Sequence, residues 1–211
     1  NENQIFSNPT EIQRLCIKQL KINPLPEKKS EFWRLSNHKK LAHFLDYEYN
    51  DNFEHNNIPK ELNSNGVLRI FIGDEQKIDF KKDDWEIKEL GENEIIKLIK
   101  EKLMEYDKNQ HWSDLLNHCL SSKKNILGLN ISGENLPPLE IFSNSIEKKF
   151  TAKTLILFMK QNTKLDLLQI NMGDENSALS VSTYLLLAKR AKLNHGFVSY
   201  GAEKSNLINS L

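Results

Sequence analysis

The sequence is poor in cysteine, because only Cys16 and Cys119 occur in 211 residues and neither has a CxxC-type partner. Two cysteines so far apart predict neither a disulfide framework nor a metal site, and they fit a reducing compartment. Each lies among apolar positions of a predicted helix. We therefore interpret both as small buried hydrophobic residues.

Long apolar runs are absent as well. The longest block, Leu155 to Met159, has the length of a strand and falls far short of the roughly 18 residues of a membrane-spanning helix. The first residues do not show the basic, apolar and small-residue order of a secretory signal. Because the chain opens on Asn1 and not on Met, we expect the natural N-terminus to lie upstream.

An excess of positive charge is also missing. Lys and Arg number 29, as do Asp and Glu, so the formal net charge is zero. This balance argues against a nucleic-acid-binding protein, which usually shows a basic patch or stripe. The Gly-rich phosphate loops GxxxxGK[ST] and GxGxxG do not occur, nor do the GxSxG and HExxH motifs. The acidic residues are scattered, so the sequence predicts no catalytic residue and no cofactor site.

The histidines do not form a metal-binding pattern. His111 and His118 are seven residues apart, about two helical turns, but no nearby acid completes a ligand set. His195 follows a predicted corner, and we expect it at the surface. The sequence therefore predicts no metal site. The six histidines are His38, His43, His55, His111, His118 and His195.

The first half of the chain predicts helices and connectors. Asn8 is a candidate cap for a first helix, with Pro9 at the first helical position and Glu11 three residues after the cap. Apolar periodicity or β-branched content predicts the remaining elements of this half. These are a short helix over 36–45, a strand over 67–72 with a partner strand over 77–80, a helix over 91–107 and a helix over 112–120.

The second half changes to short apolar runs separated by polar turns, beginning with a strand over 125–131. Two of these runs align without gaps at an offset of 28 residues. At this offset Thr154–Met159 matches Ser182–Leu187, and Gly173 matches Gly201. Thr163–Asp166 likewise matches Ala191–Asn194, which we interpret as a small-Lys-Leu-Asx corner with the leucine pointing inward.

A period of this size predicts stacked coils, because one coil of short strands cannot cover its own apolar face. The alternative is a chance similarity between two amphipathic hairpins in a β-sandwich. A solenoid needs at least three stacked units, and two clear copies are visible. We therefore expect degenerate earlier coils and a polypeptide that continues beyond Leu211.

The order of elements resembles the SufB/SufD family of iron–sulfur cluster assembly proteins, from about Pro24 onward. The resemblance depends on short motifs in a shared order, followed by the repeated coils. The motifs are Pro24-Leu25-Pro26, Glu31-Phe32-Trp33-Arg34-Leu35-Ser36, Leu115-Leu116-Asn117, the strand 125–131, and Leu136-Pro137-Pro138-Leu139. Phe32 and Leu35 depart from the usual companions of the tryptophan.

This resemblance implies an α+β, mainly β protein. A helical N-terminal domain over 1–122, with a small strand pair near 67–80, precedes the first coils of a right-handed parallel β-helix over 123–211. It implies a non-catalytic scaffold acting with a SufB-like paralogue and a SufC-like ATPase, with a homodimer also possible. The expected compartment is the bacterial cytoplasm, or alternatively the plastid stroma. No functional residue is carried over; an iron–sulfur cluster or flavin is implied only for the whole complex.

Two other readings of a β-solenoid remain open. A carbohydrate-active lyase or hydrolase would need acids, bases or aromatic residues aligned on one coil face. Tyr184 and Tyr200 are candidates for such a face, but paired catalytic carboxylates are not evident. A generic binding solenoid is the other alternative.

Overall fold

The computed structural model describes residues 9–22, 48–49, 66–74, 77–105, 117–118 and 120–210. The described elements alternate little: helices lie early in the chain and strands dominate after residue 125. The helical elements are α2 (Glu11–Ile22), α4 (Glu92–Glu105) and the 3-10 turn η4 (Lys123–Asn125). The strands are β1 (Glu48–Tyr49), β2 (Leu68–Phe71), β3 (Asp79–Lys82), β4 (Trp85–Glu89), β5 (Ile126–Ser132), β6 (Leu139–Asn144), β7 (Lys149–Met159), β8 (Lys164–Gly173), β9 (Ala178–Leu187), β10 (Lys192–Gly201) and β11 (Asn206–Ser210).

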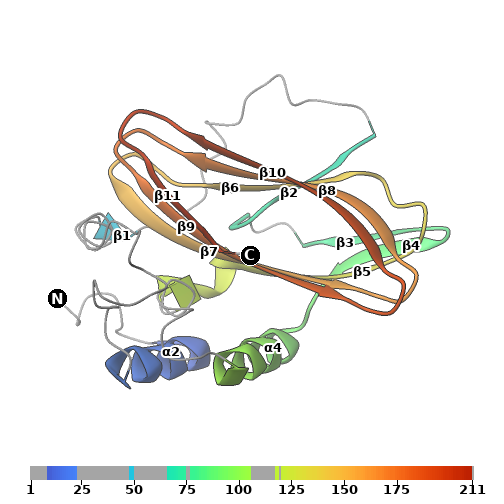
Figure 1. Cartoon of the computed structure of the whole chain (residues 1–211), viewed down its shortest axis with the longest axis horizontal. Helices are drawn as coiled ribbons and strands as arrows, with labels where there is room; N and C mark the ends of the chain where they lie inside the picture. Colours follow the sequence, from blue (N-terminus) through green and yellow to red (C-terminus); the bar gives the residue numbers. More distant parts are fainter. Residues whose placement is uncertain are drawn as a thin grey trace.

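The strands build a β-solenoid from two facing sheets (Figure 1). Sheet A has the order β11-β9-β7-β5-β4-β3, with β1 paired to β7, and sheet B has the order β10-β8-β6-β2. The chain passes alternately through the two sheets, so β5–β6, β7–β8 and β9–β10 form three stacked coils and β11 adds a further strand. The predicted solenoid is therefore confirmed, and the sandwich alternative is wrong.

The predicted repeat is the register of the coils. Thr154 pairs with Ser182, Lys164 with Lys192 and Gly173 with Gly201, each 28 residues apart and all in parallel. The same offset places Ile126 beside Thr154 and Leu139 beside Leu167. The expected degenerate earlier coil is thus β5–β6, which the sequence comparison did not align.

The corners of the coils lie slightly before the predicted position. The Lys-Leu-Asx segment Lys164–Asp166 belongs to β8, and its Leu165 is buried as expected. The left-handed residues of this turn are Asn162 (φ 63°) and, one coil later, Arg190 (φ 62°). The opposite turns repeat in the same way at Lys148 (φ 59°), Asn176 (φ 50°) and Lys204 (φ 59°). Left-handed backbone is uncommon for residues with a Cβ, so its recurrence every 28 residues shows that the coils share one turn geometry.

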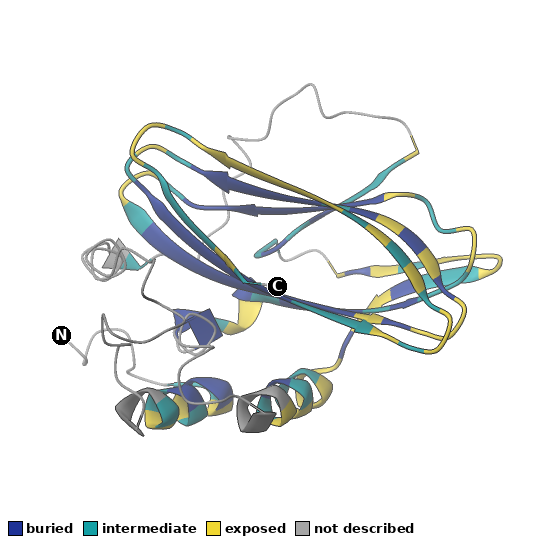
Figure 2. Ribbon diagram, viewed as in Figure 1, coloured by how far each residue is buried: buried dark blue, intermediate teal, exposed yellow. Residues whose placement is uncertain are grey.

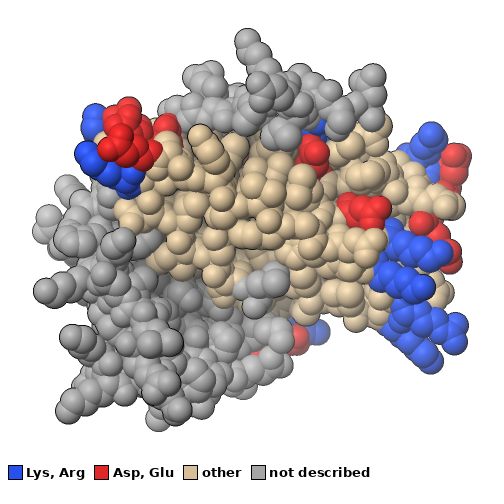
Figure 3. Space-filling view, turned by 45° about the horizontal axis from the view of Figure 1, so that its top comes forward, with Lys and Arg blue, Asp and Glu red and all other residues tan. Residues whose placement is uncertain are grey.

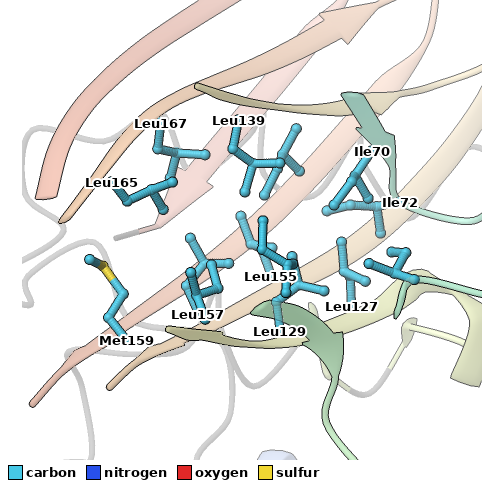
Figure 4. Close-up of a cluster of buried hydrophobic side chains, with 14 residues drawn as sticks. Ile70, Ile72, Leu127, Leu129, Leu139, Leu155, Leu157, Met159, Leu165 and Leu167 are labelled. Atoms are coloured by element: carbon cyan, nitrogen blue, oxygen red, sulfur yellow. The ribbon is translucent and has the colours of Figure 1, made fainter. Parts of the chain in front are cut away.

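The lumen between the sheets holds the main hydrophobic core (Figure 4). Leu129, Leu155 and Leu157 from sheet A face Leu139 and Ile141 from sheet B, and all five are fully buried. Because strand side chains alternate between faces, every second residue of β5, β7 and β8 enters this lumen. Buried residues concentrate in the inner coils, whereas β10 is largely exposed (Figure 2).

The helices cover the outer face of sheet A (Figure 1). Ile12 and Cys16 of α2 and Ile99 of α4 form a buried cluster with Ile156 of β7. The helix predicted over 91–107 is confirmed as α4. The first helix begins later than predicted, because Thr10 and Gln13 cap it reciprocally: the Gln13 N–H donates to Thr10 Oγ1 at 3.2 Å and the Thr10 N–H to Gln13 Oε1 at 2.8 Å.

The strands over 67–72 and 77–80 exist but do not pair with each other. β2 pairs in parallel with β6 in sheet B, while β3 pairs antiparallel with β4 in sheet A. Both strands therefore extend the solenoid sheets. The N-terminal helical domain is supported only in part, by α2, α4 and the helical residues Asn117, His118 and Leu120; the helix over 36–45 lies outside the described residues. The boundary between 122 and 123 stays a prediction.

The described helices are too short and too polar to cross a bilayer.

Candidate functional site

The terminal coil presents an uncharged β-edge. β10 and β11 are the last strands of sheets B and A, and no described strand pairs with their outer edges. Beyond Lys192, β10 carries no Lys, Arg, Asp or Glu, and β11 carries none. Phe197, Val198 and Tyr200 expose 45%, 45% and 65% of their surfaces. In the space-filling view, charged side chains gather at the two ends of the molecule and leave an uncharged stretch between them (Figure 3).

Such an edge has the properties of a pairing surface. Its backbone N–H and C=O groups are oriented for another strand, and proteins usually protect long edges with charged residues, proline or bulges. Within the strand interior of β10, residues 193–201 contain neither charge nor proline. The terminal coil can therefore accept a further coil by continuing the same parallel or antiparallel ladder.

A cleft of about 1060 Å³ lies beside the first coil, between the two helices, β5 and the β2–β3 connection. Its floor is apolar and joins the cluster under the helices to the lumen. Gly128 lets α4 approach β5, because a Cβ there would lie 2.9 Å from Ile95 Cγ1. The apolar lining residues are Ile12, Phe71, Ile78, Leu90, Ile95, Ile96, Ile126 and Leu127.

The rim of the cleft is charged but balanced. Lys123 Nζ lies 2.7 Å from Glu92 Oε2, and Glu89 Oε1 accepts a hydrogen bond from the Ile78 N–H at 3.1 Å. On the α2 side, a hydrogen bond from Lys100 lowers the pKa of Glu11. These groups are engaged with each other and form no nucleophile–base pair. The cleft is suited to hold an apolar molecule or segment.

His118 is a packing residue and not a metal ligand in this structure. It is fully buried against the outer face of sheet A, stacked on Tyr184 with ring centroids 5.5 Å apart. Its Nε2 lies 2.6 Å from the Tyr184 hydroxyl and its Nδ1 3.3 Å from Thr154 Oγ1. Asn117 Nδ2 donates to the Lys153 carbonyl at 2.7 Å, so two consecutive helical residues fasten this segment to β7 and β9.

The two tyrosines proposed for a carbohydrate site do not form one surface. Tyr184 lies on β9 in sheet A, while Tyr200 lies on β10 in sheet B. Their separation on different sheets removes the aligned aromatic face on which that alternative depended.

His195 is not a simple surface residue. It lies beside the lumen residue Leu167 in the register of β10 and β8, and its Nε2 is buried without a hydrogen-bond partner. Burial lowers the pKa of this imidazole. The surface expectation for His195 is therefore wrong for this ring nitrogen.

The structure reveals a polar compartment that the sequence did not predict. Lys153 points into the lumen and is fully buried, and Asn125 precedes it by one coil. Extending the 28-residue offset along the chain gives the column Asn125, Lys153, Val181 and Asn209. That extension was the available signal, but a lysine in an apolar strand is ordinarily interpreted as exposed.

The remaining candidates lie largely outside the described residues. His38, His43, His55, His111, Cys119 and Trp33 belong to this group. Cys16 is a free and fully buried cysteine, as predicted. Across the part of the chain that the structure describes, no three His, Cys, Asp or Glu residues gather closely enough to hold a metal ion.

Comparisons with protein-family models, with curated proteins and with solved structures gave no match for this chain.

Proposed function

We propose that this chain is a non-catalytic scaffold subunit of an iron–sulfur cluster assembly complex, similar to the SufB/SufD family. It would act with a SufB-like paralogue and a SufC-like ATPase, in the bacterial cytoplasm or the plastid stroma. The order of sequence motifs supports the family, and the stacked 28-residue coils agree with the β-helix that this resemblance implies. In this proposal any iron–sulfur cluster or flavin belongs to the assembled complex.

The observation that carries a scaffold role is the uncharged edge of the terminal coil. A strand edge of ten residues in β10, flanked by exposed Phe197, Val198 and Tyr200, combines backbone pairing with apolar burial. A coil from a paralogous solenoid would satisfy both, because its own strands repeat the same geometry. Strand addition of this kind gives affinity through main-chain hydrogen bonds and specificity through alternate side chains.

The direct test is retention of both partners by the tagged chain after co-expression with the cognate SufB-like paralogue and SufC-like ATPase. Val198→Lys places a charge on the edge strand and is expected to reduce retention of the paralogue about tenfold, the effect of about 1.4 kcal/mol on binding. Gln161→Lys is the matched control, because Gln161 is exposed at a corner of the solenoid. If the wild-type chain retains neither partner, the assignment is wrong.

A second candidate, the generic binding solenoid, is favoured by the 1060 Å³ cleft. Cavities of about this size commonly hold small molecules when their floor is apolar and a few polar groups surround it. Native mass spectrometry of the purified chain would show a co-purifying molecule if this function is correct. Replacement of Ile126 by tryptophan should then fill the cleft and abolish the added mass, while Val198→Lys should leave it unchanged.

A further inference from the structure

Lys153 is a lysine without exposed surface inside the solenoid. Its side chain projects from β7 into the lumen, where Nζ donates hydrogen bonds to the carbonyl of Ile72 and, at 3.4 Å, to Oδ1 of Asn144. Both acceptors are uncharged. Burial of an ammonium group without a nearby carboxylate is costly, and the usual response is loss of the proton.

The lumen around Lys153 contains several polar atoms that are buried and lack a hydrogen-bond partner. Thr151 lies two residues earlier on the same strand, so its side chain points into the same lumen. Ser143 pairs with Asn171 in the register of β6 and β8. The unpaired atoms are Oδ1 and Nδ2 of Asn125, Oγ of Ser143, Oγ1 of Thr151 and Oδ1 of Asn171.

Unpaired buried polar atoms are rare in folded proteins, and each costs about 1–3 kcal/mol unless water or another group reaches it. A cluster of them beside a buried amine therefore marks a compartment that gains from hydration. A bridging water needs two to four polar partners, which these side chains provide together.

No described titratable group faces Lys153 from the elements packed around it. Arg69 of β2 and Glu140 of β6 pair with each other at 2.6 Å on the opposite face of sheet B. Lys123 and Lys124 of η4, Lys149 of β7 and Asp166 of β8 lie toward strand ends or the outer surface. The groups that face Lys153 are Ile72 beyond β2, Ser143 and Asn144 of β6, Asn125 of η4, Asn171 of β8 and Val181 of β9. Burial lowers the pKa of the Lys153 amine to about 7.

We propose that the polar half of the lumen is a proton-responsive compartment, in which a charge on Lys153 draws water to the unpaired side chains and opens the first coils locally. The neutral amine suits the closed state, because its N–H groups meet the carbonyl of Ile72 and the amide oxygen of Asn144. The ammonium has no carboxylate among the described neighbours to offset its desolvation. Hydration through separation of β2 and β6 from β7 supplies that compensation.

This inference does not depend on the scaffold role. It concerns the first coils, whereas the proposed partner surface is the outer edge of β10 and β11. The two proposals therefore fail independently, since loss of partner binding leaves the lumen unchanged.

The test is hydrogen–deuterium exchange of the full chain at pH 6.0 and pH 8.5, with rates corrected for intrinsic chemical exchange. Peptides that cover residues 139–155 should lose protection at pH 6.0 by about tenfold or more relative to pH 8.5. Peptides that cover residues 157–168, around the apolar half of the lumen, should change less than about twofold. Equal protection of residues 139–155 at the two pH values in the wild-type chain would overturn the proposal without any variant.

Variants identify the responsible group. Lys153→Met keeps the length of the side chain but cannot take up a proton, so residues 139–155 should be equally protected at both pH values. Lys160→Met is the matched control, because Lys160 is exposed just after the same strand, and it should retain the wild-type response. A tenfold response that persists in a folded Lys153→Met protein would show that another group is responsible.

Discussion

The two halves of the solenoid lumen are built by the same strands but differ in chemistry. Near the corners at 160–163, the lumen is filled by Leu157, Met159, Leu165 and Leu167, which are almost completely buried. Near the opposite corners, Thr151, Lys153, Ser143 and Asn171 occupy the corresponding positions. The middle is bridged by Gln169 Nε2, which donates to Thr183 Oγ1 at 2.9 Å.

This difference shows how stability and adaptability are divided within one coil. Both halves share a continuous parallel ladder, so backbone hydrogen bonds fix the register of the polar half as well. Apolar burial contributes about 25 cal/mol per Å², whereas unpaired polar atoms subtract from stability. The apolar half should therefore determine whether the solenoid folds, and the polar half should determine how its stability responds to conditions.

The largest expected effect is in the apolar half. Leu157→Ala removes a side chain with no exposed surface and should lower the free energy of unfolding by about 3 kcal/mol, because transfer and cavity terms add. Urea unfolding followed by circular dichroism measures this change. Leu187→Ala is the control: Leu187 is 46% exposed on the next strand and should cost less than about 1 kcal/mol. Equal losses in the two variants would contradict the division.

The next effect is the pH dependence contributed by Lys153. The pKa of this amine falls from its ordinary value of 10.5 in the unfolded chain to about 7 in the folded chain. Between these values the unfolded chain binds more protons, so stability increases as pH rises through this window. From pH 7 to pH 9 the wild-type free energy of unfolding should rise by about 2 kcal/mol relative to Lys153→Met.

The measurement is a set of urea titrations of both proteins at pH 7, 8 and 9. Subtracting the Lys153→Met values removes the contributions of other titrating groups. Parallel stability curves for the two proteins would mean that the amine has an ordinary pKa when folded.

The smallest effect separates two buried threonines. Thr151 Oγ1 has no partner, whereas Thr163 Oγ1 donates to the Ile131 carbonyl at 3.4 Å. Thr151→Val should leave stability unchanged or raise it by about 1 kcal/mol, while Thr163→Val should lower it by about 1 kcal/mol. Thermal unfolding at pH 8.5, where Lys153 is mostly neutral, makes the comparison cleanest. Opposite signs in the two variants would contradict the contrast between the halves.

The sequence predicted the part of the fold that is set by a period. Thr154–Met159 and Ser182–Leu187 align because coil stacking requires equal numbers of residues per turn, and β9 pairs with β7 in that register. Pairings over long and irregular separations were not predictable in this way. Leu68 pairs with Leu139, and the intervening 70 residues obscure the offset that β2 would otherwise share with β6.

The candidate sites were harder to predict, for two physical reasons. The cleft forms where Gly128 brings α4 onto β5, a tertiary approach with no local pattern. Lys153 was missed because lysine in a strand is ordinarily at the surface, and only the positions one coil away reveal that it faces inward. The uncharged edge of β10 was visible in the residues, but its position at the end of a sheet was not.

The constant register has a consequence for changes in length. Every printed pairing between successive coils from β5 to β11 joins residues 28 apart, and the left-handed positions at 148, 176 and 204 keep the same interval. An insertion or deletion of any other size inside a coil would put one turn out of phase with its neighbours. Excision of residues 154–181, by contrast, would join Lys153 to Ser182 and restore each ladder one coil shorter. The molecule can therefore be shortened or lengthened by recombination only in whole turns, like a screw that accepts only complete threads.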